Sequence, residues 1–358
     1  MRDVTLIIEN GKKYQGKSFG YEEAVSGEVV FNTAMVGYPE SLTDPSYEGQ
    51  MLVMTYPLIG NYGVPPFTIE DNGIPKFMES DRIHVSALIV SDYTENFSHW
   101  NAVESLSEWL KKEKVPGITG IDTRELTKEL RSHGVMMGSI IFNDEPNNIP
   151  KANYENVNFV EKVSTKEIIH YNKAGNKKVV LVDCGVKANI IRELIKRDIE
   201  IIRVPWDYDY TSLNFDGVFI SNGPGNPDIC KKTVEVLQKQ MQISSKPICG
   251  ICMGNQILAK AANASIYKLK YGNRGHNQPV QQFKTNKCYI TSQNHGYAVD
   301  AKTLNNNWEE YFINMNDGSN EGIRHKTKPW FSVQFHPEAS SGPTDTEFIF
   351  DNFVESLK

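Results

Sequence analysis

The chain has 358 residues, and at about 150 residues per domain this length favours two folded domains. Apolar residues make up 39% and charged residues 23%, which excludes disorder, collagen and coiled coil, and a formal charge of −6 without basic runs predicts no nucleic-acid partner. No stretch approaches the roughly 18 apolar residues that span a bilayer, and the start does not suit a signal peptide, so we expect a cytoplasmic protein without membrane contact.

The first domain is expected at residues 1–145, as a mixed β/α, loop-rich fold. It opens with two short strand patterns, at residues 4–8 and 13–15. Asn10-Gly11 lies between them, and this dipeptide is the strongest short-range signal for a β-hairpin. We therefore expect the domain to begin with an antiparallel pair of strands.

Two helices follow later in this half. The first is expected over residues 105–112. The second begins after Asp122, because Asp122 and Glu125 have capping-box spacing, and Gly134 is expected to end it. Residues 146–177 then turn polar, with little apolar periodicity, which predicts a linker.

The second domain is expected at residues 178–358, where strands and helices alternate. Strands are expected at 178–183, 199–204, 217–220 and 247–252, and helices at 188–196, 232–242 and 255–262. Strand, helix and strand at this spacing require parallel pairing, because a parallel crossover needs a dozen or more residues. The pattern predicts a doubly wound α/β fold that binds its ligands at the carboxyl ends of the strands.

The segment Gly250-Ile251-Cys252-Met253-Gly254 has the layout of a nucleophile elbow, with sulfur in place of a hydroxyl. A strand that runs straight into a helix forms a strained turn, and flanking glycines avoid collisions there. The amide groups and macrodipole at a helix start favour an anion, here the thiolate. Cys252 is therefore the candidate nucleophile, and the simpler alternative is a buried structural cysteine.

A redox or zinc site is a second alternative, because Cys249 and Cys252 form a C-x-x-C pair. Zinc would need further ligands at ligand spacing, and the chain has no second C-x-x-C, so we expect no metal site. Cys249 falls inside the strand and is expected to point away from the exposed turn. The other three cysteines are expected to be ordinary thiols: Cys184, Cys230 and Cys288.

His336 is the candidate partner of the thiol. It follows the apolar strand 330–335 and precedes Pro337, which favours extended backbone at His336. In an extended chain residues i and i+2 project to the same side, so Glu338 can support the imidazole. His295 is the alternative base, but no carboxylate lies within three residues of it, and a structural histidine is the simpler alternative for either position.

A third element is the loop Asn222-Gly223-Pro224-Gly225 after the strand 217–220. Its glycines would let backbone amides approach a substrate and form one arm of an oxyanion hole, with the Met253 amide as the other arm. Taken alone, this loop could equally be a plain turn.

The elbow, the Gly-Pro-Gly loop and His336-Pro-Glu338 together resemble the triad-type, or class I, glutamine amidotransferases, over residues 179–357. Further segments resemble the small subunit of carbamoyl phosphate synthetase: residues 37–47, 55–63, 120–127, 183–190 and 293–300. The resemblance implies a glutaminase with the triad Cys252, His336 and Glu338. It implies that L-glutamine is held by Ser46, Gly223, Gly225, Met253, Gln256, Asn294, Gly296 and Tyr297.

The resemblance also implies a partner. In this ligase family the small subunit passes ammonia to a large subunit, which combines it with bicarbonate and ATP for arginine or pyrimidine biosynthesis. We expect no cofactor on this chain, because it shows no Walker-type phosphate loop. The resemblance places ATP and Mg²⁺ on the large subunit. The first domain is expected to dock the partner.

One residue departs from the family pattern: Asn255 stands where a histidine is common, and we expect catalysis to survive this change. Two other functions stay open. A stand-alone hydrolase of γ-glutamyl substrates would not need the docking domain, which weighs against it. A non-enzymatic regulatory protein would be favoured by loss of a triad member, and none is lost.

Overall fold

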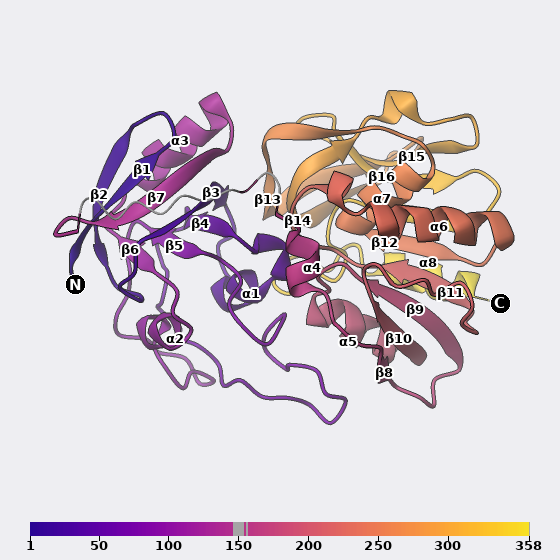
Figure 1. The fold of residues 1–358 in the computed structure, drawn as a ribbon, viewed down its shortest axis with the longest axis horizontal. Coiled ribbons are helices and arrows are strands. Elements are labelled where there is room, and N and C mark those ends of the chain that lie inside the picture. Colours follow the sequence, from indigo (N-terminus) through magenta and orange to yellow (C-terminus); the bar gives the residue numbers. More distant parts are fainter. Residues whose placement is uncertain (146–153, 155–156, 358) are drawn as a thin grey trace. The chain divides into compact units, whose positions relative to one another are not determined.

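The computed structural model describes residues 1–145, 154 and 157–357 (Figure 1). The chain divides into two compact units. The first contains Met1–Glu70 and Pro75–Val157, and the second contains Asp71–Ile74 and Asn158–Lys358. Within the described ranges, no helix has the length and apolar character needed to cross a bilayer.

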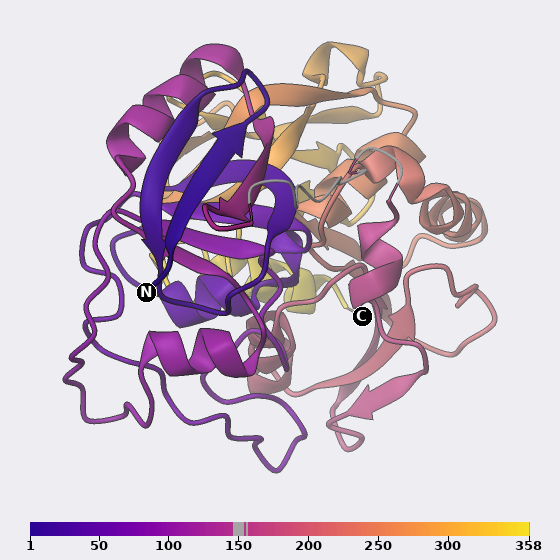
Figure 2. The same cartoon turned by 60° about the vertical axis from the view of Figure 1, so that its left-hand side comes forward.

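The first unit is built on a closed barrel in the order β1-β2-β6-β5-β4-β3-β7, which β7 closes by pairing with β1 (Figure 1, Figure 2). The strands are β1 (Asp3–Ile8), β2 (Lys13–Ser18), β3 (Val25–Asn32), β4 (Gln50–Met54), β5 (Ala87–Val90), β6 (Gly117–Thr119) and β7 (Met136–Phe142). Closure leaves no unpaired edge in this sheet. The sequence predicted a mixed domain here but not its closure into a barrel.

The expected hairpin is confirmed, because β1 and β2 pair antiparallel and Gly11 has a φ of 85°, which favours glycine. The helices of this unit are α1 (Tyr38–Thr43), α2 (Leu106–Lys112) and α3 (Thr123–His133), with a 3₁₀ turn at Pro45–Tyr47. The Asp122 side chain accepts a hydrogen bond from the Glu125 amide at 2.8 Å, and Gly134 ends α3. Both expected helices are therefore confirmed.

The second unit is one mixed sheet in the order β14-β13-β15-β16-β17-β12-β11-β9-β10-β8. Its strands are β8 (Ile169–Tyr171), β9 (Lys177–Asp183), β10 (Ile199–Pro205), β11 (Gly217–Ile220), β12 (Ile248–Ile251), β13 (Ile266–Gln282), β14 (Cys288–Val299), β15 (Trp308–Asn314), β16 (Asn320–His325) and β17 (Trp330–Val333). The five central strands, from β17 to β10, are parallel. The expected doubly wound α/β fold is thus observed.

Helices cover both faces of this sheet. They are α4 (Phe159–Val163), α5 (Ala188–Lys196), α6 (Lys231–Ile243), α7 (Met253–Ala261) and α8 (Phe348–Ser356), with 3₁₀ turns at Pro227–Ile229 and Ala301–Thr303. Alternate residues of β9 face the two sides of the sheet: Val180 lies in the core under α6 and α7, and Val179 lies in the core under α5 and α8. Burial on both faces explains the uninterrupted apolar runs in the central strands.

The strand order reverses beside β9, because α5 leads from β9 to β10 on one side and β11 lies on the other side. Ligands of doubly wound sheets bind at such a switch point, outside the carboxyl ends of the strands. The segments that begin at Cys184, Ser221, Cys252 and Gln334 follow four of these ends. They contain most of the residues that the sequence singles out.

The structure of segment 146–177 differs in part from the linker expected there. Residues 146–153 and 155–156 of it lie outside the described residues. Residues 158–177 belong to the second unit, where Phe159 and Val160 of α4 are buried and β8 pairs antiparallel with β10. A few apolar side chains anchor this polar stretch to the sheet, which its composition did not indicate.

Candidate active site

Cys252 lies at the junction of β12 and α7, with a φ of 52° and a ψ of −101°. A positive φ at a residue with a side chain is strained, as a nucleophile elbow requires. A Cβ on Gly250 would lie 2.5 Å from the Gly254 carbonyl oxygen, and a Cβ on Gly254 would lie 2.3 Å from that of Ile220. Both flanking glycines are therefore needed for helix α7 to begin this close to β11 and β12.

Replacing Gly254 by alanine is expected to destabilise the fold by about 1–3 kcal/mol, because the new methyl group meets a backbone carbonyl that cannot rotate away. The start of α7 would move, and the glutaminase activity that the resemblance implies is expected to fall with it. Thermal unfolding and glutamate release measure the two effects. A variant with unchanged stability and activity would show that the elbow tolerates a Cβ here.

His336 and Glu338 lie together beyond the end of β17. His336 Nδ1 is 2.7 Å from Glu338 Oε1, and both side chains are buried. The backbone amide of His336 donates to the Ser292 carbonyl at 2.9 Å, which ties this loop to β14. His336 Nε2 makes no ordinary hydrogen bond to a described residue, so it is available to the thiol and the substrate.

Opposite charges hold the two residues ionised. Burial opposes protonation of the imidazole, but the charges of Glu338 and Cys252 outweigh it and raise the pKa of His336 well above its ordinary value. Burial likewise opposes ionisation of Glu338, but Lys187 and His336 lower the pKa of this carboxyl below its usual range. The ring is therefore cationic at neutral pH.

Lys187 is a site residue that the sequence reasoning missed. Its Nζ lies 3.0 Å from Glu338 Oε1 and 2.8 Å from the Ala339 carbonyl oxygen, and the lysine is buried. Glu338 Oε1 therefore accepts hydrogen bonds from two cationic side chains, Lys187 and His336. The signal available in the sequence was a lysine close to the carboxyl end of strand β9, where ligands of this fold bind. Its burial explains why it is paired, because buried lysines are rare without a partner.

His295, the alternative base, has both ring nitrogens engaged. Nδ1 donates to the Tyr297 carbonyl at 2.9 Å, and Nε2 lies 3.2 Å from Gln293 Oε1 and 3.5 Å from Glu321 Oε1. A ring held in this way supports the backbone of β14. The geometry favours His336 over His295 as the partner of the Cys252 thiol.

Several residues predicted to bind glutamine lie around Cys252. Its Sγ lies 3.6 Å from the Asn294 carbonyl oxygen. Met253 begins α7, and Gln256, one turn along, donates from Nε2 to the Tyr297 carbonyl at 3.1 Å. Gly296 lies between Asn294 and Tyr297 in β14. These contacts join the helix start to the strand that carries the other predicted binding residues.

The glycine loop follows β11. Gly223 is buried, and a Cβ there would lie 2.1 Å from the Cys184 carbonyl oxygen. Gly225 has a φ of 84° and lies next to the ring of Phe159. Asn222, which the sequence reasoning left without a role, accepts from the Lys187 amide at 3.1 Å. Only glycine fits position 223 without moving the backbone.

Ser46 belongs to the first unit. It lies in the 3₁₀ turn Pro45–Tyr47, is buried, and its amide donates to Asp44 Oδ1 at 2.8 Å. Its assignment to glutamine binding stays a prediction.

Asn255, the departure from the family pattern, is buried in a polar network. Its Nδ2 donates to Gln334 Oε1 at 3.0 Å, and Ser332 donates to its Oδ1 at 2.8 Å. Gln256 also reaches Gln334 Oε1, at 3.3 Å. The asparagine therefore joins α7 to β17, the two elements that lie next to Cys252 and His336 in the sequence.

The other cysteines are separate from this chemistry. All five are free thiols. Cys249 is fully buried in the core under α5 and α8, and burial raises the pKa of its thiol. A protonated thiol inside a core is a poor redox partner for Cys252.

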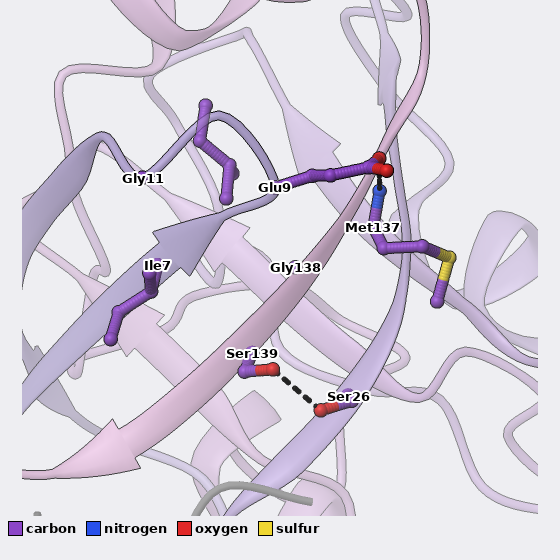
Figure 3. A pocket seen from close by; sticks show the side chains of 8 residues that line it. Ile7, Glu9, Gly11, Ser26, Met137, Gly138 and Ser139 are labelled. Carbon is purple, nitrogen blue, oxygen red and sulfur yellow. Dashed lines mark hydrogen bonds between the residues drawn. The ribbon is translucent and has the colours of Figure 1, made fainter. Parts of the chain in front are cut away.

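The first unit has a surface hollow of about 330 Å³ between β1 and β7 (Figure 3). Its Glu9 accepts from the Met137 amide at 3.3 Å, and the hydroxyls of Ser26 and Ser139 are hydrogen-bonded at 2.6 Å. None of the predicted site residues lines it. The residues that line the hollow include no cysteine and no histidine.

Comparison with known families agrees with this arrangement. Residues 180–356 match the family "Glutamine amidotransferase class-I", and residues 6–140 match "Carbamoyl-phosphate synthase small chain, CPSase domain". Among solved structures, a glutamine amidotransferase of Thermotoga maritima is 19% identical, covers 45% of this chain and 76% of its own, and has a TM-score of 0.38.

Two relatives represent two kinds of protein. The carbamoyl phosphate synthase arginine-specific small chain of Phaeosphaeria nodorum is 49% identical over 100% of this chain and 76% of its own length. Multifunctional protein pyr1-3 of Dictyostelium discoideum is 50% identical over 98% of this chain but only 17% of its own length. With both halves matched and a small-chain relative covered over three quarters of its length, the chain belongs to the carbamoyl phosphate synthase small chain family.

Proposed function

We propose that the chain hydrolyses L-glutamine to glutamate and ammonia. The observation that carries this proposal is the strained Cys252 at the start of α7, which interacts with a buried His336 that Glu338 holds by Nδ1. Thiolate and imidazolium are the paired forms that nucleophilic cysteine catalysis uses.

In the first half-reaction, Cys252 Sγ attacks the side-chain amide carbon of glutamine. The C–S bond forms, the tetrahedral oxyanion collapses, and the C–N bond breaks. The His336 imidazolium gives its proton to the departing nitrogen, which leaves as ammonia. Glu338 holds the ring in the required orientation throughout.

In the second half-reaction, neutral His336 takes a proton from water, which attacks the glutamyl thioester. The C–S bond breaks, glutamate leaves, and the thiolate and imidazolium are restored. The amides of Gly223 and Met253 are the proposed donors to the oxyanion. Substrate positioning is assigned to Ser46, Gly223, Gly225, Met253, Gln256, Asn294, Gly296 and Tyr297.

The ammonia is proposed to pass to a large carbamoyl phosphate synthase chain, docked by the first unit. That partner would combine ammonia with bicarbonate, using ATP and Mg²⁺, for arginine or pyrimidine synthesis. Two kinds of relative support arginine and pyrimidine synthesis equally. They are small-chain relatives named arginine-specific and multifunctional relatives named pyr1-3 and ura1. Free cysteines suit a reducing compartment, which supports a cytoplasmic location.

The test is glutamate release by the purified chain, alone and with the large chain of the same organism. We expect glutamate and ammonia in equal amounts, and co-purification of the two chains. With the partner, bicarbonate and ATP present, ammonia should appear as carbamoyl phosphate instead. Absence of glutamate both alone and with the partner would contradict the proposal.

A further inference from the structure

Asp183 is a buried carboxylate that the mechanism does not use. It ends β9 with its side chain fully buried. Its Oδ1 accepts from the amides of Gly185 and Val186 at 2.9 and 2.8 Å. Its Oδ2 accepts from the Thr165 amide at 2.7 Å and from Arg203 Nη2 and Nε at 2.6 and 2.8 Å. The carboxylate thus joins a turn on one side to a cation on the other.

The turn from Asp183 to Lys187 lies between the glycine loop and the triad. A Cβ on Gly185 would lie 3.0 Å from the Pro224 ring, so the turn packs tightly on the loop after β11. The Lys187 amide donates to Asn222 Oδ1, and its Nζ reaches Glu338. Any shift of this turn therefore moves the ammonium that faces the triad carboxylate.

Charges alternate along this path: the half-buried Arg203, then the buried Asp183, Lys187, Glu338 and His336. We propose that Asp183, charge-paired with Arg203, is a positioning residue that holds Lys187 against Glu338 and so keeps the His336 imidazolium in place. The proposal rests on the glutaminase function proposed above. It adds Asp183 on β9 and Arg203 on β10 to the residues that support the triad.

Asparagine cannot replace Asp183 here, although it has the same shape. If its amide oxygen faces the Gly185 and Val186 amides, its NH₂ group faces the Thr165 amide and Arg203, donor against donor. If the amide is reversed, the NH₂ group faces the turn instead. Either orientation breaks one side of the junction, because all the partners of this carboxylate are donors.

The test is steady-state glutaminase kinetics of the full chain with Asp183→Asn. We expect kcat to fall by about 10- to 100-fold, as for a small misplacement of catalytic groups, with the KM for glutamine changed by less than about threefold. Asp351→Asn is the matched control. It removes an aspartate from an arginine pair, Arg197 with Asp351 between α5 and α8, and is expected to leave kcat unchanged.

Two further variants separate positioning from a loss of folding. Arg203→Met should lower kcat like Asp183→Asn, and Arg203→Lys, which keeps the charge, should recover most of it. In a Lys187→Met background, Asp183→Asn should lower kcat by less than about threefold, because the contact that it supports is already gone.

Two results would overturn the inference. One is that the effects of Asp183→Asn and Lys187→Met on kcat multiply independently, and the other is that kcat is unchanged in both Asp183→Asn and Arg203→Met. These outcomes are separate from failure of the proposed function. If Cys252→Ala abolishes glutamate release while Asp183→Asn is fully active, only the positioning role is wrong. If Cys252→Ala stays active, the proposed mechanism itself fails.

Discussion

Replacing Cys252 by alanine is expected to lower kcat for glutamine hydrolysis by about 10³-fold or more, because no other group of the site can form the thioester. Serine at this position would keep a hydroxyl, but His336 is held as a cation and a neutral hydroxyl needs a base, so the loss should be similar. Glutamate release at saturating glutamine measures the effect.

Cys249→Ala is the informative control for this variant. Cys249 lies in strand β12 and is fully buried in the core under α5 and α8, so its loss should cost some stability but little activity. A redox pair of Cys249 and Cys252 would instead lose function on either replacement. Equal inactivation of two folded variants would therefore favour the redox alternative over hydrolysis.

Glu338→Gln is expected to lower kcat by about 10²- to 10⁴-fold. The amide can present a donor to His336 Nδ1 and thereby favour the wrong tautomer of the ring. It also removes the negative charge that, against the effect of burial, raises the pKa of His336. The Lys187 ammonium would meanwhile lose its carboxylate partner.

This variant should also change the pH dependence. A raised pKa keeps His336 protonated, and the stability that it contributes is complete below the pKa of free imidazole, about 6.5, and is lost as pH rises through the folded-state value. Without Glu338, that loss should begin at lower pH. The alkaline limb of kcat/KM is therefore expected to move to lower pH, and an alkaline limb at the wild-type position would show that the carboxylate does not support the ring.

Much of the second unit could be predicted because burial on both faces gives its central strands apolar runs that end in recognisable turns. Helix α5 was expected over 188–196 and is observed over Ala188–Lys196. The barrel of the first unit and the long hairpin of β13 and β14 were not predicted. The barrel depends on pairing between strands far apart in the sequence, such as β1 with β7, which a local pattern does not give. For β13 and β14, no strands were assigned to these residues from the sequence.

The triad was predictable because each member lies in a short motif with its own geometry. Lys187 was missed because its partner Glu338 lies 151 residues further along the chain. The choice of His336 over His295 rested on the neighbouring Glu338. The structure adds an independent reason, since Nδ1 of His295 donates to the Tyr297 carbonyl and Nε2 contacts Gln293 and Glu321.

The most direct test of the central claim is covalent trapping at Cys252. The chain is mixed with glutamine, quenched in acid during turnover, and digested for peptide mass spectrometry. The proposed mechanism predicts a glutamyl thioester on the peptide that contains Cys252, and its absence from Cys252→Ala. Glutamate formation without a thioester at Cys252, or with a label on another residue, would contradict it.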